Sequence, residues 1–230
     1  MSDPILLRVQ GLPAVELKRS ARARRLILRL DPMRGVIRLV VPAGASEEQA
    51  HRFLFRHRKW VEAHVAEMPV RMPFAAGQEV PFLGQPHRIR QAASPTARTV
   101  RAKGEIVVGG AAEHLPRRVT DYLRREAGRE VTARARVKAA SIGADVAAVS
   151  VRDTATRWGS CSRSGRLSFS WRLVMAPEPV LDYVVGHEVA HLRQMNHGPA
   201  FWALCRTLSA DADASRAWLK SHGAQLLRYG

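Results

Sequence analysis

The stretch HEVAHLRQMNHGPAFW at residues 187–202 places three histidines and one glutamate within its first eleven residues. His187 and His191 are four residues apart, so on a helix both rings emerge on one face and can bind one ion. Glu188 lies three residues before His191 and flanks that face, which suits a carboxylate beside a metal rather than on it. This H-E-x-x-H spacing predicts a metal-binding helix.

The surrounding residues favour a bound metal over the simplest alternative, which is two histidines and a glutamate on a helix surface. The neighbours of the pair are Val184, Val185, Val189, Ala190 and Leu192. They indicate a buried or half-buried helix, where two imidazoles and a carboxylate would be costly to desolvate without a partner. A bound cation would offset that cost.

A catalytic zinc site has three protein ligands and one open position for water, so a third ligand is needed. His197 follows His191 by six residues and can reach the ion only if the helix ends between them. The sequence QMNHGP at 194–199 supplies such an end, with an asparagine and then Gly-Pro opening the next helix. We favour His197 over the competing carboxylates Asp211 and Asp213, which fall in an expected loop.

The composition is that of a globular protein with 230 residues and 46% apolar residues, enough for one large domain or two small ones. No apolar run reaches the ~18 residues of a membrane span, and the start of the chain lacks the order of a signal peptide. We therefore expect a cytoplasmic location and no membrane contact. Cys161 and Cys205 are expected to be reduced.

The net charge of +17 is unevenly distributed, because residues 1–140 carry 27 basic and 13 acidic side chains, or +14, and residues 141–230 carry 10 and 7, or +3. A basic half favours weak contact with a polyanion such as nucleic acid. The alternative is that these charges only form a solvated, self-repelling surface, which has the same composition. The best candidate surface is a set of arginines on one helix: Arg117, Arg118, Arg124, Arg125 and Arg129.

Hydrophobic periodicity predicts an α+β chain. We expect a hairpin at 24–42, a helix at 45–69 with a Ser46–Gln49 capping box, and short strands within 77–109. Helices are expected at 113–141, 177–194, 198–209 and 213–227, and strands at 146–153 and 166–173. The pattern divides into a β-rich basic part at 1–110 and a metal-binding domain at 111–230.

The sequence TRWGSCSRSGRLSFSWRLVMAPEPVLDYVVGHEVAHLRQMNHGPAFW at 156–202 closely resembles the bacterial YgjP-like metallopeptidase family, which is related to the SprT-like group. The resemblance covers about 47 residues through W-G-S-C-S, the H-E-x-x-H helix and N-H-x-x-x-F-W. It implies a zincin-like helical domain with a small sheet, zinc on His187, His191 and His197, and Glu188 as the catalytic carboxylate. Gly186 departs from the family pattern, where a bulkier apolar residue is expected.

The resemblance also places the W-G-S-C run beside the cleft, with Trp158 as a candidate residue on the substrate side. Tyr183, one turn before His187, is either a second candidate for substrate contact or part of the floor of the site. Phe201 and Trp202 are expected to pack in the core.

The expected function is that of a zinc-dependent metallohydrolase, because zinc lowers the pKa of its bound water toward ~7 and Glu188 can take up the proton. The resemblance implies that the bond hydrolysed is a peptide bond. Two alternatives stay open. The same zinc-bound water would attack a nucleotide phosphoanhydride, as in a pyrophosphatase, and the basic half would suit such a substrate. The third interpretation is a nucleic-acid-binding module with a structural metal, which a fourth protein ligand would favour.

Overall fold

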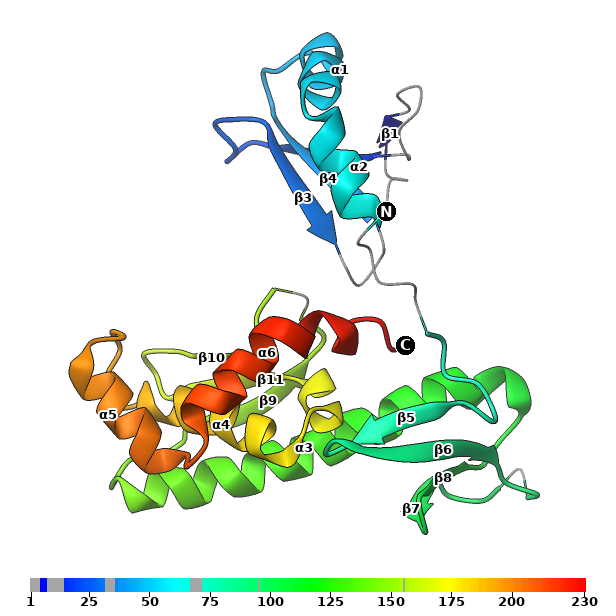
Figure 1. The fold of residues 1–230 in the computed structure, drawn as a ribbon, viewed down its shortest axis with the longest axis vertical. Helices are drawn as coiled ribbons and strands as arrows, with labels where there is room; N and C mark the ends of the chain where they lie inside the picture. Colours follow the sequence, from blue (N-terminus) through cyan, green and yellow to red (C-terminus); the bar gives the residue numbers. More distant parts are fainter. Residues whose placement is uncertain (1–4, 8–14, 32–35, 67–71, 95, 155) are drawn as a thin grey trace. The chain divides into compact units, whose positions relative to one another are not determined.

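The computed structural model describes residues 5–7, 15–31, 36–66, 72–94, 96–154 and 156–230. They form six α-helices and three small mixed sheets, which is an α+β fold, as predicted (Figure 1). The contacts divide the chain into two compact units, Met1–Arg71 and Met72–Gly230. This division lies earlier than the boundary expected near residue 110.

The first unit is a four-stranded sheet covered by two helices. Its strands are β1 (Ile5–Leu7), β2 (Val15–Ser20), β3 (Ile27–Asp31) and β4 (Val36–Pro42), in the order β1-β2-β4-β3. The two central strands are parallel, and β3 and β4 form the predicted antiparallel pair, although residues 32–35 of its turn lie outside the described residues. Leu54 and Val61 from the helices share a buried core with Leu39 and Val41 from the sheet.

The helix expected at 45–69 is two helices, α1 (Glu47–Arg56) and α2 (Arg58–Ala66), and residues 67–69 lie outside the described part. The capping box is confirmed, because Ser46 and Gln49 exchange side-chain to backbone hydrogen bonds. The break falls at His57, whose ring stacks on Phe53 and whose Nδ1 lies 2.8 Å from the Phe53 carbonyl.

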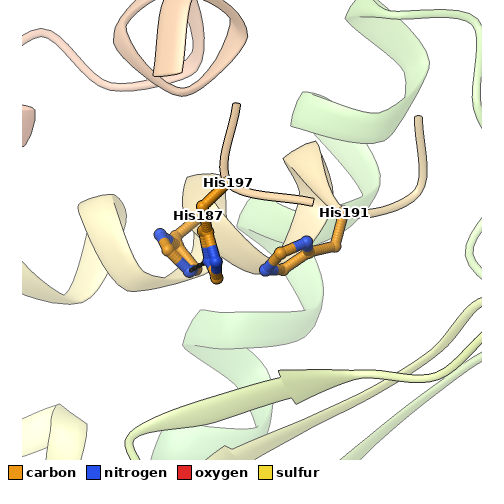
Figure 2. A group of neighbouring side chains, drawn as sticks. All are labelled: His187, His191 and His197. Carbon is orange, nitrogen blue, oxygen red and sulfur yellow. Dashed lines mark hydrogen bonds between the residues drawn. The ribbon is translucent and has the colours of Figure 1, made fainter. Parts of the chain in front are cut away.

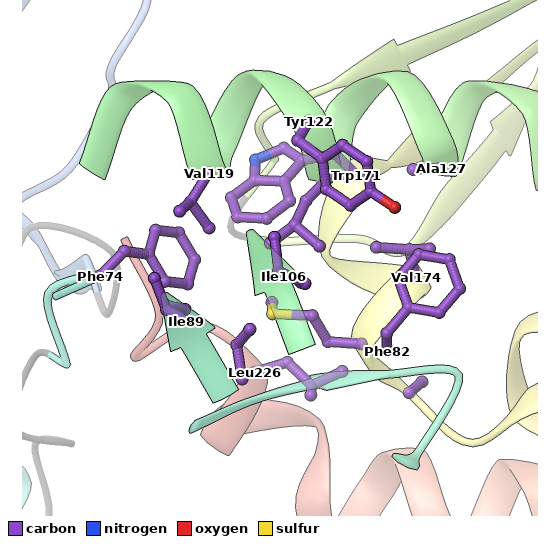
Figure 3. Packing of buried hydrophobic residues seen from close by; sticks show 14 of the residues in the cluster. Phe74, Phe82, Ile89, Ile106, Val119, Tyr122, Ala127, Trp171, Val174 and Leu226 are labelled. Carbon is purple, nitrogen blue, oxygen red and sulfur yellow. The ribbon is translucent and has the colours of Figure 1, made fainter. Parts of the chain in front are cut away.

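The second unit begins with the four strands expected within 77–109. They are β5 (Glu79–Phe82), β6 (Gln85–Gln91), β7 (Val100–Ala102) and β8 (Glu105–Val108), in the order β5-β6-β8-β7. Their apolar face packs on the first half of α3 (Leu115–Ser141), where Ile89 and Ile106 share a core with Val119 and Trp171 (Figure 3). This shared core explains why residues 72–110 belong to the second unit.

A small three-stranded sheet lies against the second half of α3. Its strands are β9 (Ala148–Arg152), β10 (Gly159–Cys161) and β11 (Arg166–Ser170), in the order β10-β11-β9. The sequence did not predict β10, which is three residues long and forms one edge of the sheet, antiparallel to β11. The strand expected to reach 173 ends at Ser170, because the buried residues Trp171–Met175 form a 3-10 turn.

Three helices complete this unit: α4 (Glu178–Ala190), α5 (Pro199–Leu208) and α6 (Ala212–Leu226). The middle helix, α4, contacts α3, α5, α6 and β10 and buries residues around nearly its whole circumference. Ion pairs from Lys138 to Asp182 (2.8 Å) and from Arg134 to Glu178 (2.6 Å) join α3 to α4. Within the described ranges, no helix combines the length and the apolar character that a membrane span requires.

Gly186 allows α4 to approach the end of α5. A Cβ at this position would collide with Oγ of the buried Ser209 and would lie 3.4 Å from Cβ of Leu208. The same Oγ donates a hydrogen bond to the Asp182 carbonyl (3.3 Å). The departure from the family pattern at Gly186 therefore has a packing reason.

Gly186→Ala should destabilise the protein. The overpacking costs ~1–3 kcal/mol and outweighs the ~1 kcal/mol that alanine gains in a helix interior. Chemical denaturation should show the loss in the wild-type background but not in a Ser209→Ala background, where the colliding oxygen is absent. An equal change in the free energy of unfolding in both backgrounds would show that Ser209 is not the obstacle.

Candidate metal centre

The end of α4 sets the positions of His187 and His191. His187 lies in the last turn of the helix, and His191 is its C-cap residue with near-helical angles (φ −63°, ψ −18°). The chain then turns, because the helix expected to reach 194 ends at Ala190. Gly198 is the N-cap of α5, so His197 sits in the short connection between the helices.

The three histidines that the sequence singled out lie together (Figure 2). One nitrogen from each ring belongs to a group whose members all lie within 4.8 Å of one another. Nε2 of His187 and Nε2 of His197 are 3.1 Å apart. Two nitrogens bound tetrahedrally to one zinc at ~2.0–2.1 Å would be about 3.4 Å apart, so this spacing is close to that of a chelating pair.

The protonation of the rings suits metal binding. Burial, helped by the neighbouring His191 and His197, lowers the pKa of His187 to about 4, and burial also lowers the pKa of His191. Neutral imidazoles are the form that binds metals. Nδ1 of His191 donates to the Gln194 carbonyl (3.0 Å), which leaves its Nε2 lone pair free, as in many histidine ligands.

No cysteine or carboxylate of the described residues joins this group. The competing ligands are elsewhere, since Asp211 is the N-cap of α6 and Asp213 pairs with Arg206 (3.4 Å). Cys161 is half-buried near Glu188, and burial together with Glu188 raises the pKa of its thiol to about 11. The three histidines therefore form a set with room for a further, non-protein ligand.

Aromatic rings form the surroundings of the histidines. Phe201, on the first turn of α5, is fully buried, and its ring centroid lies 4.9, 4.6 and 4.6 Å from those of His187, His191 and His197. Trp202 stacks on His197 at 5.6 Å. The aromatic rings cover parts of His187 and His191, which are half-buried, whereas His197 remains exposed.

The two candidate substrate residues have different surroundings. Tyr183 is buried below His187, with ring centroids 5.9 Å apart, and it belongs to the core, which fits the floor of the site. Trp158 is half-buried between the two cores of this unit and lies close to Gly223 of α6. Their contact with a substrate stays a prediction.

Glu188 lies outside the histidine group and is only 6% exposed. Burial raises the pKa of its carboxyl to about 7, and the nearby Arg157 partly opposes this rise. A cation bound to the histidines would oppose it further. The carboxylate is therefore a desolvated base next to the group rather than a surface charge.

The carboxylate of Glu188 packs against the backbone of β10. A Cβ on Gly159 would lie 2.5 Å from Oε1 and 2.8 Å from Cδ of Glu188, so only glycine leaves room there. Sequence reasoning placed the W-G-S-C run near the cleft through the family resemblance but did not identify this contact. No spacing rule could have found it, because Gly159 and Glu188 belong to different elements.

Two further features near the site were not anticipated. Arg216 of α6 lies over the Trp202 ring (5.0 Å) and contributes to the lowered pKa of His187. A cavity of about 510 Å³ borders His191 and is lined mainly by the turns at 143–145 and 162–165 and by residues 191–193 and Met195. This cavity lies between the loop after α4 and the β10–β11 turn.

Comparison with known proteins gives two findings. The chain matches the YgjP-like metallopeptidase domain over residues 24–222, whereas no curated protein matches it. Among solved structures, it is similar to the crystal structure of the metallopeptidase zymogen of Pyrococcus abyssi abylysin, at 19% identity and a TM-score of 0.35. That similarity covers 39% of this chain and 93% of the other.

His197→Ala should lower the zinc content of the purified protein well below the one equivalent expected for a three-histidine site. The reason is that two imidazoles on one helical turn bind zinc more weakly than three. Elemental analysis after dialysis measures this directly. His222→Ala, which removes an exposed histidine outside the group, is the matched control. Full zinc content in His197→Ala would remove His197 from the site.

Proposed function

Because this chain belongs to the YgjP-like metallopeptidase family, we propose that it is a zinc-dependent peptidase whose catalytic base is Glu188. The observation that carries the proposal is a buried carboxylate next to three histidines, with no fourth protein ligand in the described residues. This is the ligand number of a catalytic zinc site rather than of a structural one.

The residues fit zinc better than a hard cation, because they offer three imidazole nitrogens and no oxygen ligand. A zinc ion supplies a Lewis acid that polarises the scissile carbonyl and lowers the pKa of water toward ~7. His187, His191 and His197 would hold the ion, and the Gln194 carbonyl would fix the tautomer of His191.

Glu188 would transfer a proton from the attacking water to the leaving group. Its carboxylate is held between α4 and the backbone of Gly159, so its position is set by packing rather than by a flexible side chain. It takes a proton from the attacking water and delivers that proton to the leaving amine nitrogen as the peptide bond breaks. The desolvated surroundings keep bulk water from competing for this proton.

The free edge of β10 supports a peptide as substrate. β10 pairs with β11 on one side, and its other side has no partner strand among the described residues. An extended peptide would add to this edge through main-chain hydrogen bonds, beside the strand against which Glu188 packs. A nucleotide has no backbone that could use such an edge.

Two alternative functions remain proposals, with less support than the peptidase. A nucleotide phosphoanhydride hydrolase would use the same histidines and Glu188 and would differ only in substrate. A nucleic-acid-binding module with a structural metal lacks the fourth ligand that it would need in the described residues. The cytoplasmic location also stays a prediction from the sequence.

Glu188→Gln should retain zinc and the thermal transition of the wild type, while peptide hydrolysis falls by ~10²-fold or more. The isosteric amide keeps the packing against Gly159 but cannot accept the proton. Zinc-loaded protein would be assayed on peptide mixtures, an unfolded protein and nucleoside triphosphates. Turnover of the triphosphates alone would favour the phosphoanhydride alternative, and undiminished peptide hydrolysis by Glu188→Gln would contradict the role of Glu188.

Gly159→Ala should impair hydrolysis with less effect on zinc content, because the added methyl group must displace the Glu188 carboxylate. A displacement of about 1 Å can lower the rate by ~10²-fold. Gly44→Ala is the matched control, since a Cβ there meets nothing within 4 Å and Gly44 belongs to the first unit. Normal kcat in Gly159→Ala would show that the strand does not position the base.

A further inference from the structure

A second pocket lies between β7 and the first half of α3, within the same unit as the histidines. It has a volume of about 800 Å³. Its lining residues are Arg98, Thr99, Val100, Arg101, Arg118, Asp121, Tyr122, Arg125, Glu126 and Arg129. None of the histidines lines it, and the helix α4 that carries His187 packs on the second half of α3 instead.

The pocket has an excess of positive charge, with five arginines and two carboxylates. Glu126 pairs with Arg125 (3.5 Å) and with Arg129 (3.0 Å). Asp121 pairs with Arg117, which is not part of the lining (3.6 Å). The remaining three arginines have no carboxylate partner among the described residues: Arg98, Arg101 and Arg118.

The α3 surface proposed from sequence is therefore not a uniform row of free charges. Arg117, Arg125 and Arg129 pair with carboxylates on their own helix, and Arg124 pairs with Asp153 (3.1 Å). Arg118 differs from these four, because it has no carboxylate partner among the described residues. The uncompensated charge lies in the pocket rather than along the exposed helix face.

Arg118 lies against the backbone of Gly110. Gly110 has φ +97°, and a Cβ there would lie 2.5 Å from both Cζ and Nε of Arg118. Nε of Arg118 is buried and has no hydrogen-bond partner among the described residues. This nitrogen is closed to a ligand in the pocket, so it is the unpaired charge of the guanidinium that an anion there would offset.

Arg101 lines the pocket from the side of β7. Its guanidinium lies over the Phe82 ring (4.1 Å), and its Nη1 is 3.5 Å from Nε2 of His87. Arg101 comes from β7 and Arg118 from α3, so two elements supply arginines to the lining of one pocket. Arg101 is exposed and also lines a neighbouring cavity of about 640 Å³ together with Phe82 and His87.

We propose that this pocket binds a phosphate chain, meaning a ligand with two or more neighbouring phosphate groups. Guanidinium groups bind phosphate through paired, charge-assisted hydrogen bonds. Three uncompensated arginines call for more negative charge than one carboxylate carries, and the volume exceeds that of a single phosphate group. Inorganic polyphosphate and the backbone of a single-stranded nucleic acid share this chemistry.

The proposed site does not depend on the peptidase assignment. Phosphate chains would bind on the first half of a 27-residue helix, whose length is about 40 Å at 1.5 Å per residue. The histidines are associated with the other half through α4. The site would thus attach the unit to a polyanion without placing phosphate at the candidate metal centre.

The test uses the full-length, zinc-loaded protein with tripolyphosphate, a labelled single-stranded oligonucleotide and polyglutamate as probes at low salt. The Arg101→Gln/Arg118→Gln variant should bind the phosphate probes about tenfold more weakly or worse, because two charged hydrogen-bonding groups are lost. Arg136→Gln/Arg152→Gln removes the same charge from outside the pocket and should change binding by no more than about twofold. Arg98→Gln, at an exposed side chain, repeats the test if the first variant does not fold.

Binding of tripolyphosphate alone would identify polyphosphate as the ligand, and binding of the oligonucleotide alone would identify nucleic acid. Binding of both would support phosphate-chain recognition in general. Three results would overturn the proposal: no binding of either phosphate probe, equal losses in the pocket variant and its control, or binding of polyglutamate as tight as that of the phosphates. Zinc content, measured in every variant, separates this test from the fate of the peptidase proposal.

Discussion

The burial of α4 on nearly all sides is the constraint on which the site depends. In a helix surrounded by α3, α5, α6 and β10, polar atoms of Glu188 and His187 that lack a partner or a ligand are costly to bury. Nδ1 of His187 is such an atom, with no hydrogen-bond partner among the described residues. The neighbouring elements are shaped accordingly. Gly186 admits the end of α5, and Gly159 admits the carboxylate of Glu188. These two close approaches set the positions of α4 and of the Glu188 carboxylate by packing.

The second constraint is where α4 ends. Two ligands one turn apart need only a helix, but the third requires the chain to reverse within six residues. The helix ends at Ala190, the Gln194 carbonyl receives the His191 hydrogen bond, and Gly198 caps the next helix. Phe201, on the first turn of that helix, then packs against all three imidazoles. The same turn thus brings His197 to the site and supplies its apolar wall.

The sequence alone was enough to predict the features that depend on the spacing of neighbouring residues. The histidine group, the capping box at Ser46 and most helices and strands follow from periodicity and end signals. It could not predict what depends on contacts between elements. β10 is too short to show alternation, and its place beside Glu188 arises from tertiary packing. The sequence alone did not indicate a unit boundary near residue 71, because nothing in it shows that the strands of 79–108 share a buried core with α3.

The most direct test of the central claim, a three-histidine centre with one position left open, is zinc K-edge X-ray absorption on the zinc-loaded protein. The account predicts three imidazole nitrogens at ~2.0–2.1 Å and one further oxygen or nitrogen atom that is not from the protein. A sulfur at ~2.3 Å, which would come from Cys161 or Cys205, would contradict it. A fourth imidazole would also contradict it, because the site would then be closed and structural.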